Sequence, residues 1–142
     1  MMFCDERHVS SGMLLALYQH KDSVQRHETQ LLASLPRKKQ AWKLIVVGKL
    51  MNQSRLLRYL GLTRYAEQIQ ILAKRVQSGD PSNVEAQGAR LYFNALHGQE
   101  FYRSDDENEI NAKLNYGYTI LRSSMARAII AAGLHPGYAV YH

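Results

Sequence analysis

Hydrophobic positions recur at helical spacing over most of the chain that follows residue 35. The run 36–60 contains no proline after Pro36, which suits the first turn of a helix because an N–H there would lack a partner. Gly61 then favours a left-handed helix end. A second helix is predicted over 63–77. The apolar side chains that this helix places on one face are Tyr65, Ile69, Leu72 and Val76.

Turn residues separate two further helical runs. The order Ser-Gly-Asp-Pro predicts Asp80 as an N-cap and Pro81 as the first residue of a helix that ends near Gly98. Ser104 is typical of a capping box and opens the last predicted helix, which extends to about Ala132. The residues expected on its buried face are Ile110, Leu114, Gly117, Leu121 and Ala128.

The two ends of the chain have a less regular pattern. Phe3 and Cys4 could end a strand, 10–12 is typical of a turn, and 13–18 could form one short helix. Near the other end, 138–141 alternates as a strand does. The predicted fold class is therefore mainly α, a helical bundle with at most a short strand near each terminus.

Composition is that of a globular protein. The chain has 142 residues, of which 46% are hydrophobic and 21% charged, so extensive disorder is excluded. No apolar run approaches the roughly 20 residues that a membrane-spanning helix needs. The sequence begins without the pattern of a signal peptide and contains one cysteine, Cys4. These features predict a cytoplasmic protein with no membrane partner.

Positive charge is concentrated in one part of the chain. The formal net charge is +6, and 36–79 holds ten of the 18 cations but a single acid, Glu67. Such a segment attracts polyanions, among which nucleic acid is the most frequent partner. A solvated basic helix face, or a surface for an acidic protein, would carry the same pattern.

Glu85 is the acidic residue with the most unusual surroundings. Its predicted helix has one apolar stripe through Val84 and Gly88, and the positions at helical spacing from Glu85 itself are also largely apolar. A carboxylate on or beside a buried face needs a cation, which could be an arginine, a lysine or a metal ion. The sequence favours an ordinary salt bridge. The arginines considered as its partner are Arg90, Arg122 and Arg127.

The last predicted helix carries a second group of polar side chains. Asn111, Asn115, Tyr118 and Arg122 recur at helical spacing, and most of them are neutral hydrogen-bonding groups. They could line a polar cleft for phosphates or sugars, or satisfy hydrogen bonds between helices. Signatures of a glycine-rich phosphate loop, a zinc site or a nucleophile elbow are absent from the sequence.

Three ordered motifs resemble one known family. They are 85–93 (EAQGARLYF), 111–121 (NAKLNYGYTIL) and 131–142 (AAGLHPGYAVYH). The motifs are similar to those of the CRISPR-associated spacer-integration endonuclease, the catalytic integrase subunit of the CRISPR adaptation complex, in its type II form. Residues 3–8, Trp42 and the pair Asn52-Gln53 resemble that family too, so the similarity covers essentially the whole chain.

The resemblance implies a metal-dependent DNA endonuclease that inserts new spacers into a CRISPR array by transesterification. Carried across by motif, Glu85 and His142 are the catalytic residues and ligands of Mg²⁺ or Mn²⁺. Implied partners are DNA, a second copy of the chain and a small companion protein of the adaptation complex. The side chains expected to contact DNA are Lys49, Arg55, Arg58, Arg64, Lys74, Arg75, Asn115, Tyr116 and Arg122.

The sequence departs from the family pattern at both ends. In the family an N-terminal β-sandwich precedes the helical domain, so 1–28 is expected to be a linker or the end of such a domain. The remainder, 29–142, is expected to be the helical integrase domain, ending before the third acidic metal ligand could appear. Three hypotheses follow: a retained metal-dependent nuclease, an inert DNA-binding module, or a helical remnant that only packs against itself or partners.

Overall fold

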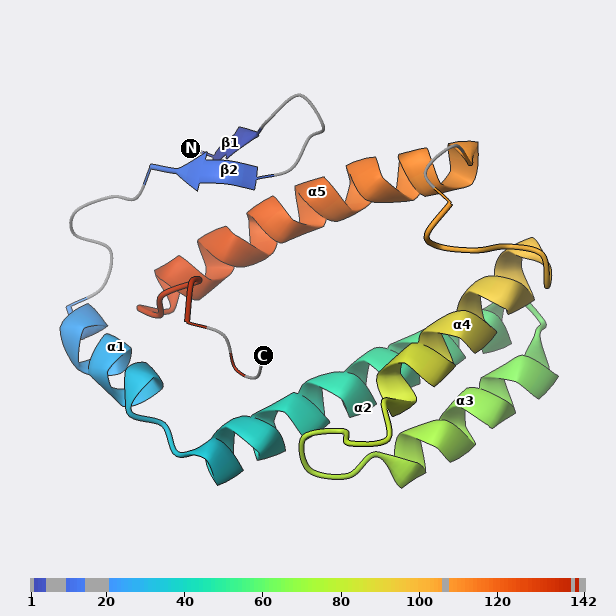
Figure 1. Ribbon diagram of the computed structural model, residues 1–142, viewed down its shortest axis with the longest axis horizontal. Coiled ribbons are helices and arrows are strands. Elements are labelled where there is room, and N and C mark those ends of the chain that lie inside the picture. Colours follow the sequence, from blue (N-terminus) through green and yellow to red (C-terminus); the bar gives the residue numbers. More distant parts are fainter. Residues whose placement is uncertain (1, 5–9, 15–20, 106–107, 139, 141–142) are drawn as a thin grey trace. The chain divides into compact units, whose positions relative to one another are not determined.

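The computed structural model describes the whole chain except 1, 5–9, 15–20, 106–107, 139 and 141–142. Its elements confirm the mainly α fold class (Figure 1). None of its described helices is long and apolar enough to cross a membrane. In chain order the elements are β1 (Met2–Cys4), β2 (Ser10–Met13), α1 (Ser23–Leu31), α2 (Leu35–Tyr59), α3 (Thr63–Arg75), α4 (Val84–His97) and α5 (Glu109–Ala131).

The chain divides into two compact units. The first unit combines Met1–Ala33 with Arg103–Ala139, and the second combines Ser34–Tyr102 with Val140–His142. The expected domain limits, 1–28 and 29–142, stay a prediction.

The second unit is built on α2, which packs against both α3 and α4. Its buried residues recur along these helices at the helical spacing that the sequence indicated, and Leu50 and Ile69 are fully buried. The α2–α3 turn is also as predicted, because Gly61 has a φ of 79°. The core residues are Val46, Leu50, Leu57, Ala66, Ile69, Ala73, Val76 and Val84.

The start of α4 differs from the prediction that Asp80 caps it and Pro81 begins it. The helix begins at Val84, and its N-cap is Asn83. The N–H of Asn83 donates to the carbonyl of Asp80 at 3.0 Å, so Pro81 lies inside a turn rather than in the helix. Asp80 still caps α4 from a distance, since its two carboxylate oxygens accept from the N–H groups of Val84 and Glu85, each at 2.9 Å.

The N-terminal part of the first unit also departs from the expectation. β1 and β2 form an antiparallel pair in which Phe3 lies opposite Gly12, so 10–12 is strand rather than turn and Met13 belongs to that strand. The rest of the short helix expected up to residue 18 lies outside the described residues, apart from Leu14, which is not helical. The helix α1, in a stretch expected to be irregular, was missed because its sequence is mostly polar.

The long helix α5 ends as predicted, with Gly133 at a φ of 75° after it, but it begins differently. Its N-cap is Asn108, whose side-chain oxygen accepts from the N–H groups of Ile110 and Asn111, and not Ser104. The predicted buried face is wrong for three residues. Apolar residues occur on all sides of this helix, so spacing alone selects no face. The three residues that were predicted to be buried but are exposed are Ile110, Leu121 and Ala128.

Two further positions correct the prediction near the C-terminus. Tyr138 and Val140 are not in a strand, and the other residues of the strand expected over 138–141 lie outside the described part.

In α5 the buried residues are Asn111 and Ala126. The first unit therefore buries a polar side chain, which requires hydrogen-bond partners.

Candidate functional site

Glu85 lies at the edge of the packed face of α4. Val84 and Gly88 on the same helix are buried, whereas the Glu85 side chain is 29% exposed. Gly88 packs directly onto α2: a Cβ added there would overlap the Leu50 side chain. The absence of a side chain at 88 therefore lets α4 approach α2 closely, beside Glu85.

This close approach brings Lys49 to Glu85. The Lys49 ammonium donates to Oε1 of Glu85, and the lysine side chain is 43% exposed. The predicted need of Glu85 for a cation is thus confirmed, but the cation is Lys49 and not Arg90, Arg122 or Arg127. The sequence could not identify Lys49, because its distance to Glu85 depends on how two helices pack.

His142, the second predicted catalytic residue and metal ligand, lies outside the described residues. Within the part of the chain that the structure describes, no three His, Cys, Asp or Glu side chains gather as a metal site would. Of the two predicted ligands, Glu85 lies within the described residues. A partly exposed carboxylate balanced by one ammonium fits a divalent cation, since oxygen ligands suit Mg²⁺ and Mn²⁺ and a cation could take the place of the lysine.

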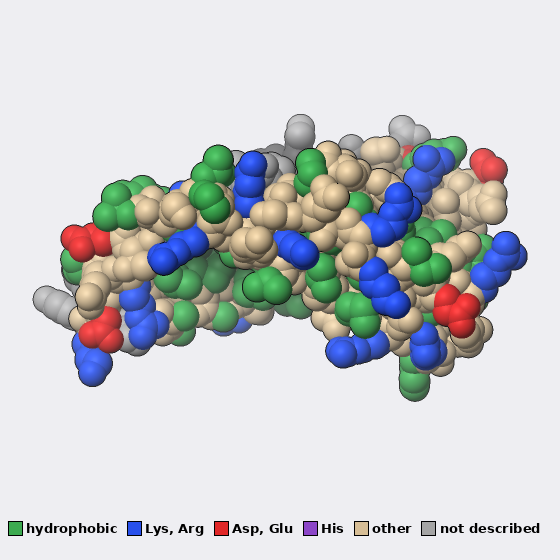
Figure 2. Space-filling view, turned by 90° about the horizontal axis from the view of Figure 1, so that it is seen from below, with side chains coloured by type: hydrophobic (Ala, Val, Ile, Leu, Met, Phe, Trp, Pro, Cys, Tyr) green, Lys and Arg blue, Asp and Glu red, His purple; other side chains and the backbone are tan. Residues whose placement is uncertain are grey.

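The other predicted DNA-contacting cations of the second unit are exposed. Arg55 and Arg58 lie in the C-terminal half of α2, Arg64 in the first turn of α3, and Lys74 and Arg75 in its last turn. Figure 2 shows Lys and Arg side chains spread over one face, among neutral and hydrophobic side chains and with few acids between them. Such a surface suits the phosphate backbone of a nucleic acid.

The polar face of α5 belongs to the first unit, and Arg103 organises part of it. Arg103 donates to the side-chain oxygens of Asn111 at 3.3 Å and Asn115 at 2.6 Å, and its guanidinium lies 5.5 Å from the centre of the Tyr118 ring. Asn111 in turn donates to the carbonyl of Asp105 at 2.7 Å. The asparagines therefore satisfy hydrogen bonds within the protein, to the segment before α5. No pattern in the sequence pointed to Arg103, which precedes the helix.

The remaining predicted contacts on α5, Tyr116 and Arg122, are both exposed. Both lie in the first unit, whereas Glu85 lies in the second. Their predicted contact with DNA, like that of Asn115, stays a prediction.

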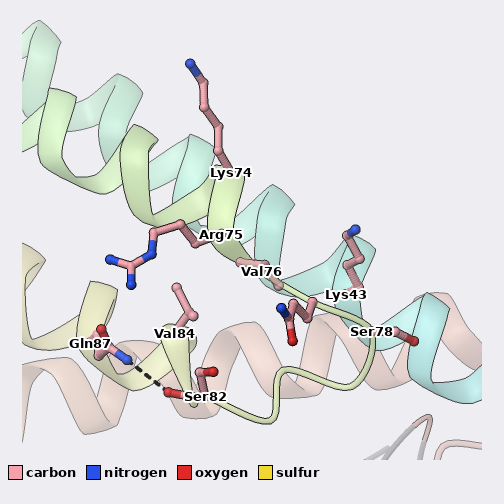
Figure 3. Close-up of a pocket in the computed structure, with 9 residues that line it drawn as sticks. Lys43, Lys74, Arg75, Val76, Ser78, Ser82, Val84 and Gln87 are labelled. Carbon is pink, nitrogen blue, oxygen red and sulfur yellow. Dashed lines mark hydrogen bonds between the residues drawn. The ribbon is translucent and has the colours of Figure 1, made fainter.

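A pocket of about 570 Å³ opens in the second unit between the end of α3, the α3–α4 loop, α2 and the start of α4 (Figure 3). Sequence reasoning selected Lys74 and Arg75 from its lining but missed Lys43 and the neutral polar residues. The complete lining is Lys43, Lys74, Arg75, Val76, Gln77, Ser78, Ser82, Val84 and Gln87.

Comparison with known proteins gives a consistent result. The family model described as "CRISPR associated protein Cas1" matches residues 1–142. A CRISPR-associated endonuclease Cas1 of Neisseria meningitidis serogroup C is 39% identical over 142 residues, which is 100% of this chain and 46% of the relative. A CRISPR-associated endonuclease Cas1 of Pyrobaculum aerophilum is 36% identical over 115 residues, covering 70% of this chain and 38% of the relative.

A third relative, a CRISPR-associated endonuclease Cas1 of Francisella tularensis subsp. novicida, is 25% identical over 162 residues, covering 100% of this chain and 50% of the relative. The chain thus spans about half the length of these relatives or less. The match of the family model and the identity to the Neisseria protein agree with the resemblance of the three motifs. The chain belongs to the Cas1 family of CRISPR-associated proteins.

Proposed function

We propose that the protein to which this chain belongs is a metal-dependent DNA endonuclease and integrase that inserts new spacers into a CRISPR array. Membership of the Cas1 family supports the CRISPR role, and the relatives are named endonucleases. The observation that carries the proposal is Glu85: a partly exposed carboxylate in one of the three motifs that resemble the family, in a unit rich in exposed cations.

Glu85 and His142 are the residues proposed to hold Mg²⁺ or Mn²⁺. A bound divalent cation would polarise the phosphodiester and stabilise negative charge on the leaving oxygen. The carboxylate of Glu85 supplies an oxygen ligand, and Lys49 balances its charge when no metal is bound.

The reaction needs no nucleophilic side chain from the protein. The 3′-hydroxyl oxygen of one DNA attacks the phosphorus of a phosphodiester in another, a new P–O bond forms, and the bond to the leaving 3′-oxygen breaks. The attacking hydroxyl gives up its proton, the leaving oxygen takes one up, and nothing is oxidised or reduced. The protein has to bind and orient two polyanions. The residues proposed for this role are Lys49, Arg55, Arg58, Arg64, Lys74, Arg75, Asn115, Tyr116 and Arg122.

The partners and the cellular location that we propose are those of the family. The partners are DNA, both a short duplex and the CRISPR repeat, a second copy of the protein, and a small companion protein of the adaptation complex. The proposed location is the cytoplasm, without a membrane partner.

The test is strand transfer and cleavage on branched DNA in the presence of Mn²⁺ or Mg²⁺, with Glu85→Gln compared with Glu67→Gln. Glu67 is an exposed acid on α3, and its replacement by glutamine removes the same negative charge as Glu85→Gln. We expect Glu85→Gln to abolish the metal-dependent products and Glu67→Gln to leave them unchanged. Activity that persists in Glu85→Gln, or that needs no divalent cation, would reject the mechanism.

The second candidate is a helical DNA-binding module without catalysis. The observation in its favour is the Lys49 ammonium, which already neutralises Glu85 as a metal would. This candidate predicts that the affinity for DNA falls steeply as the salt concentration is raised. It also predicts that no DNA is cleaved in the presence of any divalent metal ion. An affinity for DNA that does not change with salt would contradict it.

A further inference from the structure

Gln53 on α2 has a buried side-chain oxygen that no protein group satisfies. Its Oε1 is closed to solvent, and no donor among the described residues lies within hydrogen-bonding distance of it. Within the described part of the chain, no other buried side-chain oxygen or nitrogen is in this state. A buried acceptor without a partner lowers the stability of a protein, so nearly all such atoms are paired. The amide of Gln53 therefore points to a ligand rather than to packing.

The contacts of α4 show that it runs in the same direction as α2, beside which it lies (Figure 1). The loop that leads to α4 meets the first part of α2, where the N–H of Gly79 donates to the carbonyl of Lys39 at 3.1 Å. Further along both helices, Lys49 donates to Glu85. Because the paired residue numbers rise together, the position one turn after Lys49 lies level with the position one turn after Glu85.

These two positions are occupied by Gln53 and Ala89. Gln53 follows Lys49 by four residues, so the two side chains share one face of α2. Ala89 follows Glu85 by four residues in the same way on α4. Alanine has no polar side-chain atom and offers the amide no hydrogen bond. The ion pair between α2 and α4 is thus followed, one turn along, by an amide oxygen without a partner.

The group that this oxygen lacks is a hydrogen-bond donor. Glu85 is proposed to hold a divalent cation, and Mg²⁺ keeps several water molecules when it binds to a protein. A cation polarises the O–H bonds of its water and makes that water a strong donor. An amide oxygen accepts such a bond without adding charge. Residues that hydrogen-bond to the ligands of a metal commonly change its affinity by about ten- to a hundredfold.

We propose that Gln53 is a positioning residue of the proposed metal site, and that its side-chain oxygen accepts a hydrogen bond from the hydration shell of the divalent cation at Glu85. The inference rests on the proposed metal-dependent function. The unpaired oxygen lowers the stability of the metal-free protein and gains its partner when the cation binds. Glu85 supplies the ligand, and Gln53 orients the water beside it.

The experiment compares Gln53→Met with Gln68→Met. Methionine has nearly the length of glutamine but only a weak acceptor, and Gln68 is an exposed glutamine on α3. Isothermal titration measures the affinity for Mn²⁺, and thermal unfolding measures the stability of the metal-free protein. Two further variants are included. Glu85→Gln removes the proposed ligand, and Gln53→Glu keeps an acceptor oxygen at the same distance from the backbone.

We expect Gln53→Met to bind Mn²⁺ at least about tenfold more weakly than the wild type. The same variant should unfold several degrees higher without metal, because an unsatisfied acceptor has been removed. Gln68→Met should change neither quantity, and Gln53→Glu should bind Mn²⁺ at least as tightly as the wild type. An unchanged Mn²⁺ affinity in Gln53→Met would overturn the inference. A lower unfolding temperature in that variant would overturn it too, since the oxygen would then have a partner in the protein.

The remaining variants separate this inference from the proposed function. If the wild type and Glu85→Gln bind Mn²⁺ equally, the proposed metal site fails and the role of Gln53 fails with it. If Glu85→Gln loses Mn²⁺ while Gln53→Met retains it, the role of Gln53 alone fails. A Gln53→Glu protein that binds as weakly as Gln53→Met would show that the acceptor oxygen is not what the cation needs.

Discussion

Gln30 and His135 exchange two hydrogen bonds across 105 residues of sequence. The Gln30 side-chain oxygen accepts from the His135 N–H at 2.9 Å, and its amide nitrogen donates to the His135 carbonyl, also at 2.9 Å. The same nitrogen donates to the carbonyl of Tyr138 at 3.0 Å, and Arg26 donates to the carbonyl of Ala132 at 2.6 Å. Helix α1 therefore holds the backbone that follows α5.

Replacing Gln30 by alanine is expected to release this segment. Three hydrogen bonds are lost at a partly buried site, which should cost about 1–3 kcal/mol of local stability. The measurement is hydrogen exchange of the His135 amide, which should speed up markedly. Gln25→Ala, an exposed position on the same helix, is the control and should leave that amide protected. Unchanged exchange in Gln30→Ala would contradict the expectation.

The contact between Gly88 and Leu50 predicts a contrast between two glycines. Gly88→Ala forces a Cβ into the Leu50 side chain, which is fully buried, and should destabilise the protein by about 1–3 kcal/mol. Gly48→Ala on α2 meets nothing within 4 Å and should stabilise by about 0.5–1 kcal/mol, because alanine favours the helix. Chemical denaturation measures both. Similar effects at the two positions would show that α4 does not pack on α2 in this way.

Asp80 is expected to matter for the start of α4 despite lying outside it. Asp80→Ala removes two acceptors and places alanine at a φ of 48°, so a loss of at least about 1–2 kcal/mol is expected. Asp80→Asn keeps one oxygen and tolerates this backbone, and it should lose less. Exchange of the Val84 and Glu85 amides locates the effect. A larger loss in Asp80→Asn than in Asp80→Ala would refute the capping role.

The ion pair of Lys49 and Glu85 should contribute little to folding. Both side chains are partly exposed, so a double-mutant cycle with Lys49→Met and Glu85→Gln should give a coupling below about 1 kcal/mol. The free energy of unfolding at low and high salt is the measurement. A coupling of several kcal/mol would mean that the main role of the ion pair is to stabilise the fold rather than to form part of a functional site.

Lys49 and a divalent cation are expected to compete for the same carboxylate. If Glu85 is a metal ligand, Lys49→Met should bind Mn²⁺ several-fold more tightly than the wild type, because the metal no longer displaces an ammonium. Isothermal titration measures this affinity directly, and Lys38→Met controls for the loss of one positive charge on α2. Equal affinities in all three proteins would mean that Lys49 does not occupy the metal position.

Local sequence signals predicted the parts of this fold that local interactions determine. The bounds of α2 and α3 and the turn at Gly61 follow from helical spacing and glycine, and the buried stripe through Val84 and Gly88 follows from periodicity. The errors are of two kinds: the starts of α4 and α5 were assigned to the wrong capping residue, and contacts between separate segments were not foreseen. The pairing of β2 with β1 could not be predicted from a segment that resembles a turn.

The same limit applies to the candidate site. The motif and its apolar surroundings identified Glu85 and its need for a cation. The choice of Lys49 over the arginines depends on how α4 packs on α2, and the pocket depends on a loop tied to α2 through Gly79. Arg103 binds Asn111 and Asn115 only because the segment before α5 folds back along that helix.

The lack of a side chain at Gly88 affects more than the packing of the hydrophobic core. Enlarging that position changes neither the net charge nor any group that can touch DNA, yet it pushes apart the two helices that carry an ammonium and a carboxylate. A protein altered only there could stay folded and keep its affinity for polyanions while its acid loses its counter-ion. A change in the affinity of Glu85 for a divalent cation in such a variant would then originate in steric crowding one helical turn away from that carboxylate.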